Sequence, residues 1–116
     1  MNFGIRSEQA DGVSIIALTG EVDLYTAPDL KEELVRVIDE GARQVVIDLT
    51  DTTFIDSTTL GVLVSGLKRL RPEGGRLMLV ITDRNIKKIF EITGLDRVFP
   101  IHEARTGALE ELNGAG

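Results

Sequence analysis

The sequence predicts an α/β fold in which a mixed β-sheet begins with a hairpin and continues with parallel strands. Three observations predict it: a β-branched run preceded by a tight turn, two further apolar runs of strand length, and helical periodicity between and after them. Right-handed crossovers would join the parallel strands. At 116 residues the chain has the size of one domain, so we expect residues 1–116 to form a single unit.

The N-terminal part predicts a hairpin followed by a helix. Residues 13–18, VSIIAL, are rich in β-branched side chains, and the Asp-Gly pair before them suits a tight turn from a first strand near residues 3–9. From Thr26 onward apolar residues recur at helical spacing, Pro28 fits a first turn, and Gly41 ends the pattern. We therefore expect Thr26 to cap the first helix.

The central part predicts two buried strands with a helix between them. QVVIDL at 44–49 and RLMLVI at 76–81 are nearly continuous apolar runs, as in strands that are covered on both faces of a sheet. Between them, leucine and valine side chains from Leu60 to Leu70 fall on one face of a second helix, which ends before RPEGG.

The C-terminal part predicts two short helices and an edge strand. Asp83 can cap a helix that Gly94 closes. The run RVFPI at 97–101 is typical of an edge strand, because proline is poorly tolerated in a central one. We expect a last helix over 104–112, fraying into a tail over 110–116.

Composition excludes several classes of function. The chain has no cysteine and one histidine, His102, so disulfides, thiolate sites and the usual metal-ligand clusters are excluded. A formal net charge of −6 argues against nucleic acid, since duplex affinity comes largely from basic residues. No apolar run approaches the roughly 20 residues of a membrane span, and the N-terminus lacks a signal-peptide pattern. We therefore expect a cytoplasmic protein with no cofactor or metal, whose partner is a protein and not nucleic acid or a membrane.

The stretch FIDSTTLG at 54–61 places three hydroxyl side chains where a strand leads into a helix. Functional groups gather at such strand ends in α/β sheets, and the helix N-terminus favours negative charge, including a phosphate on Ser57. Alternatively, Asp56 or Ser57 only caps the helix, and Thr58 and Thr59 are ordinary first-turn residues. A nucleophilic hydrolase or a nucleotide-binding loop is disfavoured, because GxSxG and GxxxxGK[ST] are both missing.

Three sequence blocks carry a resemblance that extends over almost the whole chain. ALTGEVDLYTAPDL, VVIDLTDTTFIDSTTLGVLV and IFEITGLDRVFPI resemble successive blocks of the bacterial anti-sigma-factor antagonists, the single-domain proteins of the STAS family. The resemblance implies a STAS-like mixed sheet with about four helices packed mainly on one face.

The resemblance also implies a partner switch at Ser57. In this family the matching serine is phosphorylated by an anti-sigma factor that is also a serine kinase, and a serine phosphatase removes the phosphate. The unphosphorylated antagonist binds the anti-sigma factor and releases the sigma factor, whereas phosphorylation ends that binding. This protein would then be a substrate and a binder, not an enzyme, and we expect a monomer when it is free.

Two loops are implied as the partner surface. GEVDLYTAP is expected to lie near the serine loop, although by itself it also fits a plain turn with a helix cap. Its Tyr25 is the only tyrosine and could anchor a partner. The expected partner-binding residues are Asp23, Tyr25, Thr26, Asp56, Ser57, Thr58, Thr59, Leu60 and Gly61.

One position departs from the family pattern. The family often has glycine where this chain has Thr59, in a run such as DSTGLG. We interpret Thr59 as a tolerated helical residue, since helix interiors disfavour glycine, and not as an obstacle to a kinase. Thr58 and Thr59 are also possible phosphate acceptors. A second hypothesis is a constitutive STAS docking subunit, for example of a transport ATPase, which the intact DST motif disfavours.

Overall fold

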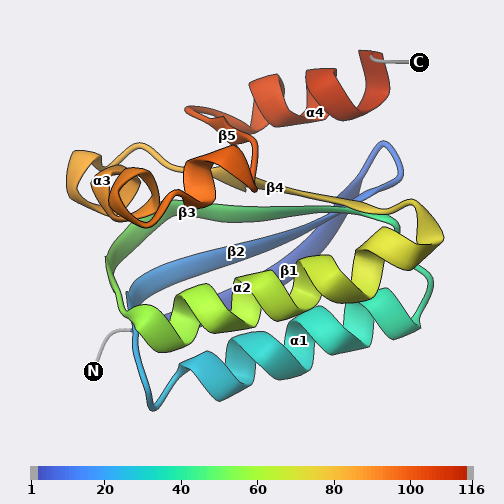
Figure 1. Cartoon of the computed structure of the whole chain (residues 1–116). Helices are drawn as coiled ribbons and strands as arrows, with labels where there is room; N and C mark the ends of the chain where they lie inside the picture. Colours follow the sequence, from blue (N-terminus) through green and yellow to red (C-terminus); the bar gives the residue numbers. More distant parts are fainter. Residues whose placement is uncertain (1–2, 115–116) are drawn as a thin grey trace.

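One five-stranded sheet forms the centre of the computed structural model, which describes residues 3–114. Its strands lie in sequence order: β1 (Phe3–Ala10), β2 (Val13–Val22), β3 (Gln44–Ile55), β4 (Arg76–Val80) and β5 (Ile101–His102). β1 and β2 are antiparallel, and each later neighbouring pair is parallel. The predicted hairpin followed by parallel strands is confirmed (Figure 1).

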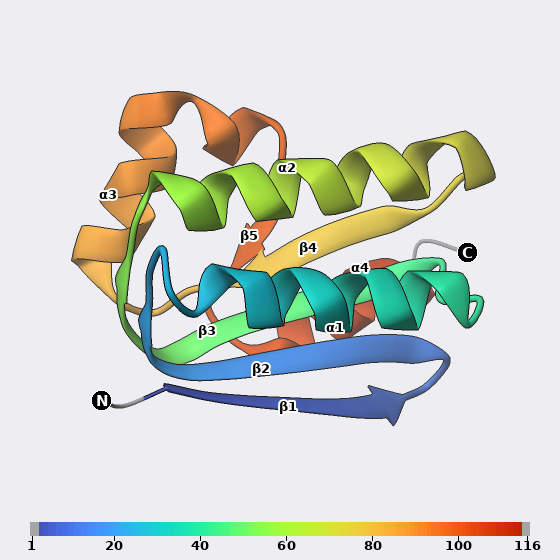
Figure 2. The ribbon, with the colours of Figure 1, turned by 90° about the horizontal axis from the view of Figure 1, so that it is seen from below.

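Four α-helices surround the sheet within the described residues: α1 (Ala27–Asp39), α2 (Ser57–Leu70), α3 (Arg84–Thr93) and α4 (Arg105–Gly114). Two short 3-10 helices, η1 (Arg71–Glu73) and η2 (Leu95–Arg97), follow α2 and α3. α1 and α2 lie side by side on one face, and α4 covers the other (Figures 1 and 2). Ile86 and Phe90 of α3 belong to the same core cluster as the inner sides of α1 and α2, so the helices are mainly on one face, as expected, with α4 as the exception.

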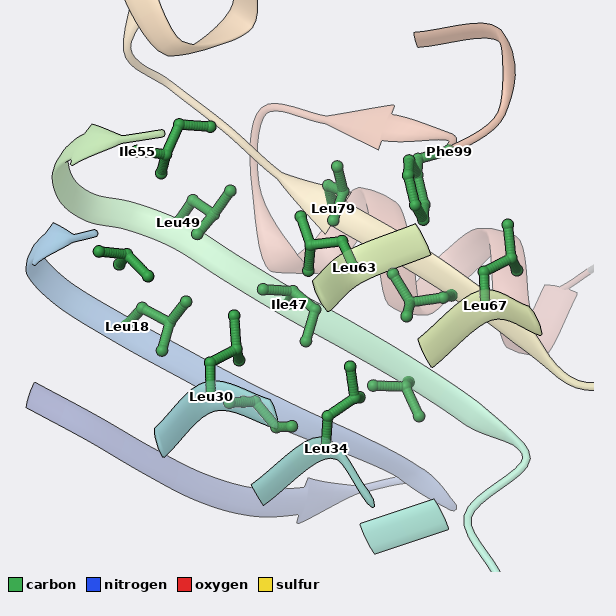
Figure 3. Packing of buried hydrophobic residues seen from close by; sticks show 14 of the residues in the cluster. Leu18, Leu30, Leu34, Ile47, Leu49, Ile55, Leu63, Leu67, Leu79 and Phe99 are labelled. Carbon is green, nitrogen blue, oxygen red and sulfur yellow. The ribbon is translucent and has the colours of Figure 1, made fainter. Parts of the chain in front are cut away.

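The larger hydrophobic core lies between the sheet and the α1–α2 layer. Leu30 and Leu34 of α1 and Leu63 of α2 point toward Ile47 of β3 (Figure 3). Gly66 brings the two helices close together, because a Cβ at this position would collide with the side chain of Leu34. A smaller cluster on the opposite face packs α4 against the sheet. Both clusters bury the apolar runs that predicted strands covered on both faces.

The ends of two strands differ from the prediction. β3 was expected near 44–49 but continues to Ile55, because its second half keeps pairing with β2 as far as Val22. The expected edge strand at 97–101 is reduced to Ile101–His102. The residues before it form η2 and a turn that buries Phe99 in the core. The edge position itself is confirmed, since β5 pairs with β4 only.

The predicted frayed tail over 110–116 is wrong for residues 110–114. α4 continues to Gly114, and Leu112 is buried against the sheet. The carboxylate of Glu111 lies 2.9 Å from an Arg76 guanidinium nitrogen and 2.8 Å from His102 Nε2. These contacts hold the last turns of α4 in place. Residues 115 and 116 lie outside the described residues.

Candidate functional site

Two loops leave the same end of the sheet next to each other. The parallel ladder between β2 and β3 ends with Val22 opposite Ile55, so the loop after β2 and the start of α2 begin at neighbouring points (Figures 1 and 2). The hydroxyl of Thr59 donates a hydrogen bond to the Val22 carbonyl at 2.8 Å. This bond joins the end of β2 to the start of α2.

Asp56 caps α2, as one of the two predicted alternatives proposed. Its backbone is extended, with φ −124° and ψ −176°, and its Oδ1 accepts a hydrogen bond from the Thr59 amide at 3.2 Å. This satisfies one of the amides that a helix N-terminus leaves free. Ser57 is the first residue of α2, and its side chain is exposed. Asp56 therefore caps α2 while the Ser57 side chain stays accessible to solvent, so the two predicted alternatives do not exclude each other.

The first turn of α2 divides into an outer and an inner side. Ser57, Thr58 and Gly61 are exposed, whereas Leu60 is partly buried against the core. Thr59 has an exposed fraction of 0%. The expectations that Thr59 contacts a partner or accepts a phosphate are therefore wrong, because its side chain points inward. For the same reason it does not narrow the approach of a kinase.

The loop after β2 is a closed turn, the Asp23–Thr26 turn. The Asp23 carboxylate accepts hydrogen bonds from the amides of Tyr25 at 2.9 Å and Thr26 at 3.2 Å. The Thr26 hydroxyl accepts from the Asp23 amide at 2.8 Å and lies 3.2 Å from the Glu21 carbonyl. Thr26 precedes α1, but its side chain makes no capping bond, so the predicted cap is wrong. Thr26 is also buried and supports the turn rather than facing a partner.

The Asp23–Thr26 turn exposes two apolar side chains. Leu24 is 61% exposed and Tyr25 is 79% exposed. Tyr25 was predicted from the sequence as an anchor for a partner, but Leu24 was not, because a leucine next to a strand is equally typical of a buried core residue. Exposed large apolar side chains that adjoin each other are typical of protein-binding surfaces. The turn therefore offers two possible anchors beside Ser57.

A cleft between β3 and α3 adjoins the other side of this site. Its volume is about 410 Å³, and its lining includes Thr53, Phe54, Ile55, Ile86 and Ile89. Phe54 is 47% exposed. This cleft was not predicted from the sequence, because it depends on β3 extending to Ile55 beside α3. The last β3 residue in its lining, Ile55, precedes Asp56 in the chain, and no residue of α2 lines the cleft.

The electrostatics of the predicted site are acidic. Its nine predicted residues include two aspartates and no lysine or arginine. A phosphate on Ser57 would add about −1.5 to −2 charges at pH 7 without a cationic partner from this set. The helix N-terminus would compensate part of that charge. The site can thus carry a phosphate, but it would then present a strongly negative surface.

Catalytic alternatives find no support in the contacts of the site. His102, the one histidine, pairs with Glu111 of α4, and the hydrogen bonds of residues 3–114 include none between His102 and Ser57. Residues 3–114 hold no group of three side chains suited to a metal ion.

In the same part of the chain, every helix is too short or too polar to cross a membrane.

Comparisons with known proteins agree with this architecture. The STAS domain family model matches residues 4–108. The anti-sigma-B factor antagonist of Bacillus subtilis is 34% identical over 110 residues, which cover 95% of this chain and 100% of that protein. Its Staphylococcus aureus counterpart is 33% identical over 89% of this chain and 95% of its own length. The crystal structure of an anti-sigma factor antagonist from Mycobacterium paratuberculosis superposes with a TM-score of 0.86 at 30% identity, covering 93% of this chain and 92% of that one. The resemblance seen in the sequence is confirmed: the chain belongs to the STAS domain family.

Proposed function

We propose that this protein is an anti-sigma factor antagonist whose binding is switched off by phosphorylation of Ser57. The names of relatives that match the chain over nearly its whole length support the first part of the proposal. The observation that carries the second is the exposed serine at the start of α2, placed beside the exposed Leu24 and Tyr25. The unphosphorylated protein binds an anti-sigma factor, which then releases its sigma factor to RNA polymerase in the cytoplasm.

Two partners act on the switch in this proposal. The anti-sigma factor is itself a serine kinase and transfers a phosphate from ATP to the Ser57 hydroxyl. A serine phosphatase removes the phosphate and restores binding. The protein is the substrate of both and catalyses neither step. The exposed position of Ser57 in the first turn of α2 supports this, because both enzymes need access to the hydroxyl.

The charge of the site explains how a phosphate would end binding. Within the free protein, the N-terminus of α2 accommodates the added charge, so the fold is unchanged. In a packed interface the dianion loses its water, and the predicted site offers no lysine or arginine to pair with it. The cost of burying this charge then exceeds what a single interface residue usually contributes.

Binding measurements on two Ser57 variants test the proposal. Ser57→Ala should bind the anti-sigma factor like the unphosphorylated protein and resist the kinase, whereas Ser57→Asp should bind at least tenfold more weakly. Ser65→Asp is the matched control, because it puts the same charge on an exposed serine further along α2, outside the predicted partner-binding residues, and should leave the affinity unchanged. Titration calorimetry with unchanged circular dichroism spectra separates binding from folding. Equal affinity of Ser57→Asp and the unmodified protein contradicts the switch and favours constitutive docking.

A further inference from the structure

We infer that Thr59 is a positioning residue whose buried hydroxyl ties the Asp23–Thr26 turn to the first turn of α2. Tyr25 and Ser57 are thereby presented as one preformed surface. The consequence for partner binding rests on the proposed function, whereas the tie itself is a property of the free protein.

The Thr59 bond lies at the last pair of the β2–β3 ladder. That pair is Val22 and Ile55, and beyond it the ladder no longer joins the two segments. The Thr59 hydroxyl lies 2.8 Å from the Val22 carbonyl and 3.4 Å from Asp56 Oδ1. A hydroxyl has one proton and donates one hydrogen bond, so the shorter distance makes the Val22 carbonyl the acceptor.

Thr59 takes part in both segments at once. Its amide donates to the capping carboxylate of Asp56, which fixes it to the start of α2. Its side chain reaches Val22, the residue immediately before the Asp23–Thr26 turn. Among the side-chain hydrogen bonds of residues 3–114, this one alone connects the end of β2, next to the Asp23–Thr26 turn, with the start of α2. The remaining bonds in this region lie within one segment or the other.

The Asp23–Thr26 turn is closed by its own hydrogen bonds, so a constraint on Val22 also constrains the turn. The carboxylate of Asp23 and the hydroxyl of Thr26 close the turn from inside. Its backbone adds hydrogen bonds from the amides of Thr26 and Ala27 to the Asp23 carbonyl, at 3.1 and 2.7 Å. Fixing Val22 therefore also limits the positions that the exposed Tyr25 can take.

Space filling alone does not account for a threonine here. A valine has nearly the same shape and would fill the same volume, but it would leave the Val22 carbonyl without the hydroxyl proton. The turn would then move more independently of α2. A partner that contacts both Tyr25 and Ser57 would have to order the two segments on binding, which lowers affinity.

Amide hydrogen exchange of the free protein, measured by NMR, tests the tie without any partner. The variants are Thr59→Val, which removes the hydroxyl, and Thr59→Ser, which keeps it; Thr58→Val is the exposed neighbour control. In Thr59→Val we expect exchange in the turn to be about five- to tenfold faster, the change that corresponds to one lost net hydrogen bond. The amides of Tyr25 and Thr26 in the turn and of Ala27 at the start of α1 are compared with those of Ile47 and Leu49 in the sheet.

Each outcome decides for or against the inference. Faster exchange confined to the turn in Thr59→Val, with Thr59→Ser and Thr58→Val close to the unmodified protein, supports it. Unchanged exchange in the turn, an equal increase in the sheet, or Thr59→Ser behaving like Thr59→Val overturns it. Should Thr59→Val not fold, the unmodified protein decides: a protected Thr59 hydroxyl proton with a nuclear Overhauser contact to the Asp23 amide supports the tie, and free exchange of that proton with water overturns it.

Affinity measurements distinguish a failure of this inference from a failure of the proposed function. Thr59→Val should bind the anti-sigma factor about five- to tenfold more weakly than Thr59→Ser, while the kinase still phosphorylates Ser57 in both. Equal affinities of the two variants would show that the Thr59 hydroxyl does not help present Tyr25 and Ser57 to a partner, even if the exchange result is as expected. Failure of the unmodified protein to bind any anti-sigma factor refutes the proposed function and leaves the exchange result intact.

Discussion

Replacing Arg105 by methionine should destabilise the protein by removing the partner of a buried carboxylate. Asp48 lies on β3 with a side chain only 9% exposed, and Arg105 Nε of α4 lies 2.6 Å from its Oδ2. The amide of Thr50 also donates to this carboxylate, at 2.9 Å. Arg105 pairs in addition with Glu8 of β1, so one guanidinium holds α4 against two strands.

The expected loss is about 2 kcal/mol of unfolding free energy at pH 7, the usual worth of a charge-assisted hydrogen bond. Breaking a fully buried ion pair costs about 3–5 kcal/mol, but Arg105 is 32% exposed and Thr50 still bonds the carboxylate, which reduces the penalty. Glu8→Gln removes only the more exposed pair and should cost less than about 1 kcal/mol. Urea unfolding of Arg105→Met, Glu8→Gln and the unmodified protein measures both values.

The pH dependence of this difference provides an internal check. Burial raises the pKa of the Asp48 carboxyl, but hydrogen bonds from Thr50 and Arg105 outweigh it and hold the pKa below its ordinary value. A depressed folded pKa contributes stability above the unfolded pKa of about 3.9, which is lost as the pH falls through the folded pKa. The gap between Arg105→Met and the unmodified protein should therefore shrink below about pH 4. A gap that is absent at pH 7, or that grows in acid, would show that Arg105 does not stabilise the Asp48 carboxylate.

Three further predictions concern other contacts. The hydrogen bonds from Arg36 and then Ser7 lower the pKa of Glu33 from 4.5 to about 2. Its carboxyl carbon resonance should therefore titrate near pH 2. The stability that the ionised carboxylate contributes should be lost as the pH falls from 4.5 to about 2. Asp56→Ala should lower the unfolding free energy by about 1 kcal/mol in urea titrations, and Asp56→Asn should retain most of it, because both aspartate and asparagine cap helices well. Tyr25→Ala should leave the melting temperature unchanged and weaken binding to the anti-sigma factor at least tenfold, since its side chain is 79% exposed and supports no core contact; unchanged affinity argues against this turn as an anchor.

Local patterns in the sequence predicted the features that depend on neighbouring residues. The Asp11–Gly12 turn has φ values of 53° and 79°, as its residue types favour, and Asp56 caps the helix that follows it. Thr26 shows the limit of this reasoning. A threonine before a helix usually caps it, but here the hydroxyl is used inside the Asp23–Thr26 turn.

Features that depend on distant contacts could not be predicted from local patterns. The Thr59–Val22 bond joins residues 37 positions apart and requires the β2–β3 ladder to extend to Ile55. The last turns of α4 have a weak apolar pattern, and Glu111 is held by Arg76, 35 residues earlier. The resemblance to the STAS family predicted that the two loops meet. It did not predict which of their side chains face inward.

The phosphorylation of Ser57 can be measured by intact-mass spectrometry with peptide mapping after incubation with ATP and a kinase-type anti-sigma factor. We expect one phosphoryl group on Ser57, none on the Ser57→Ala variant, unchanged modification of Thr58→Val, and dissociation of the complex as the phosphate is added. Stable binding with no phosphate at Ser57, or a phosphorylated protein that stays bound as tightly as before, would contradict the proposed switch.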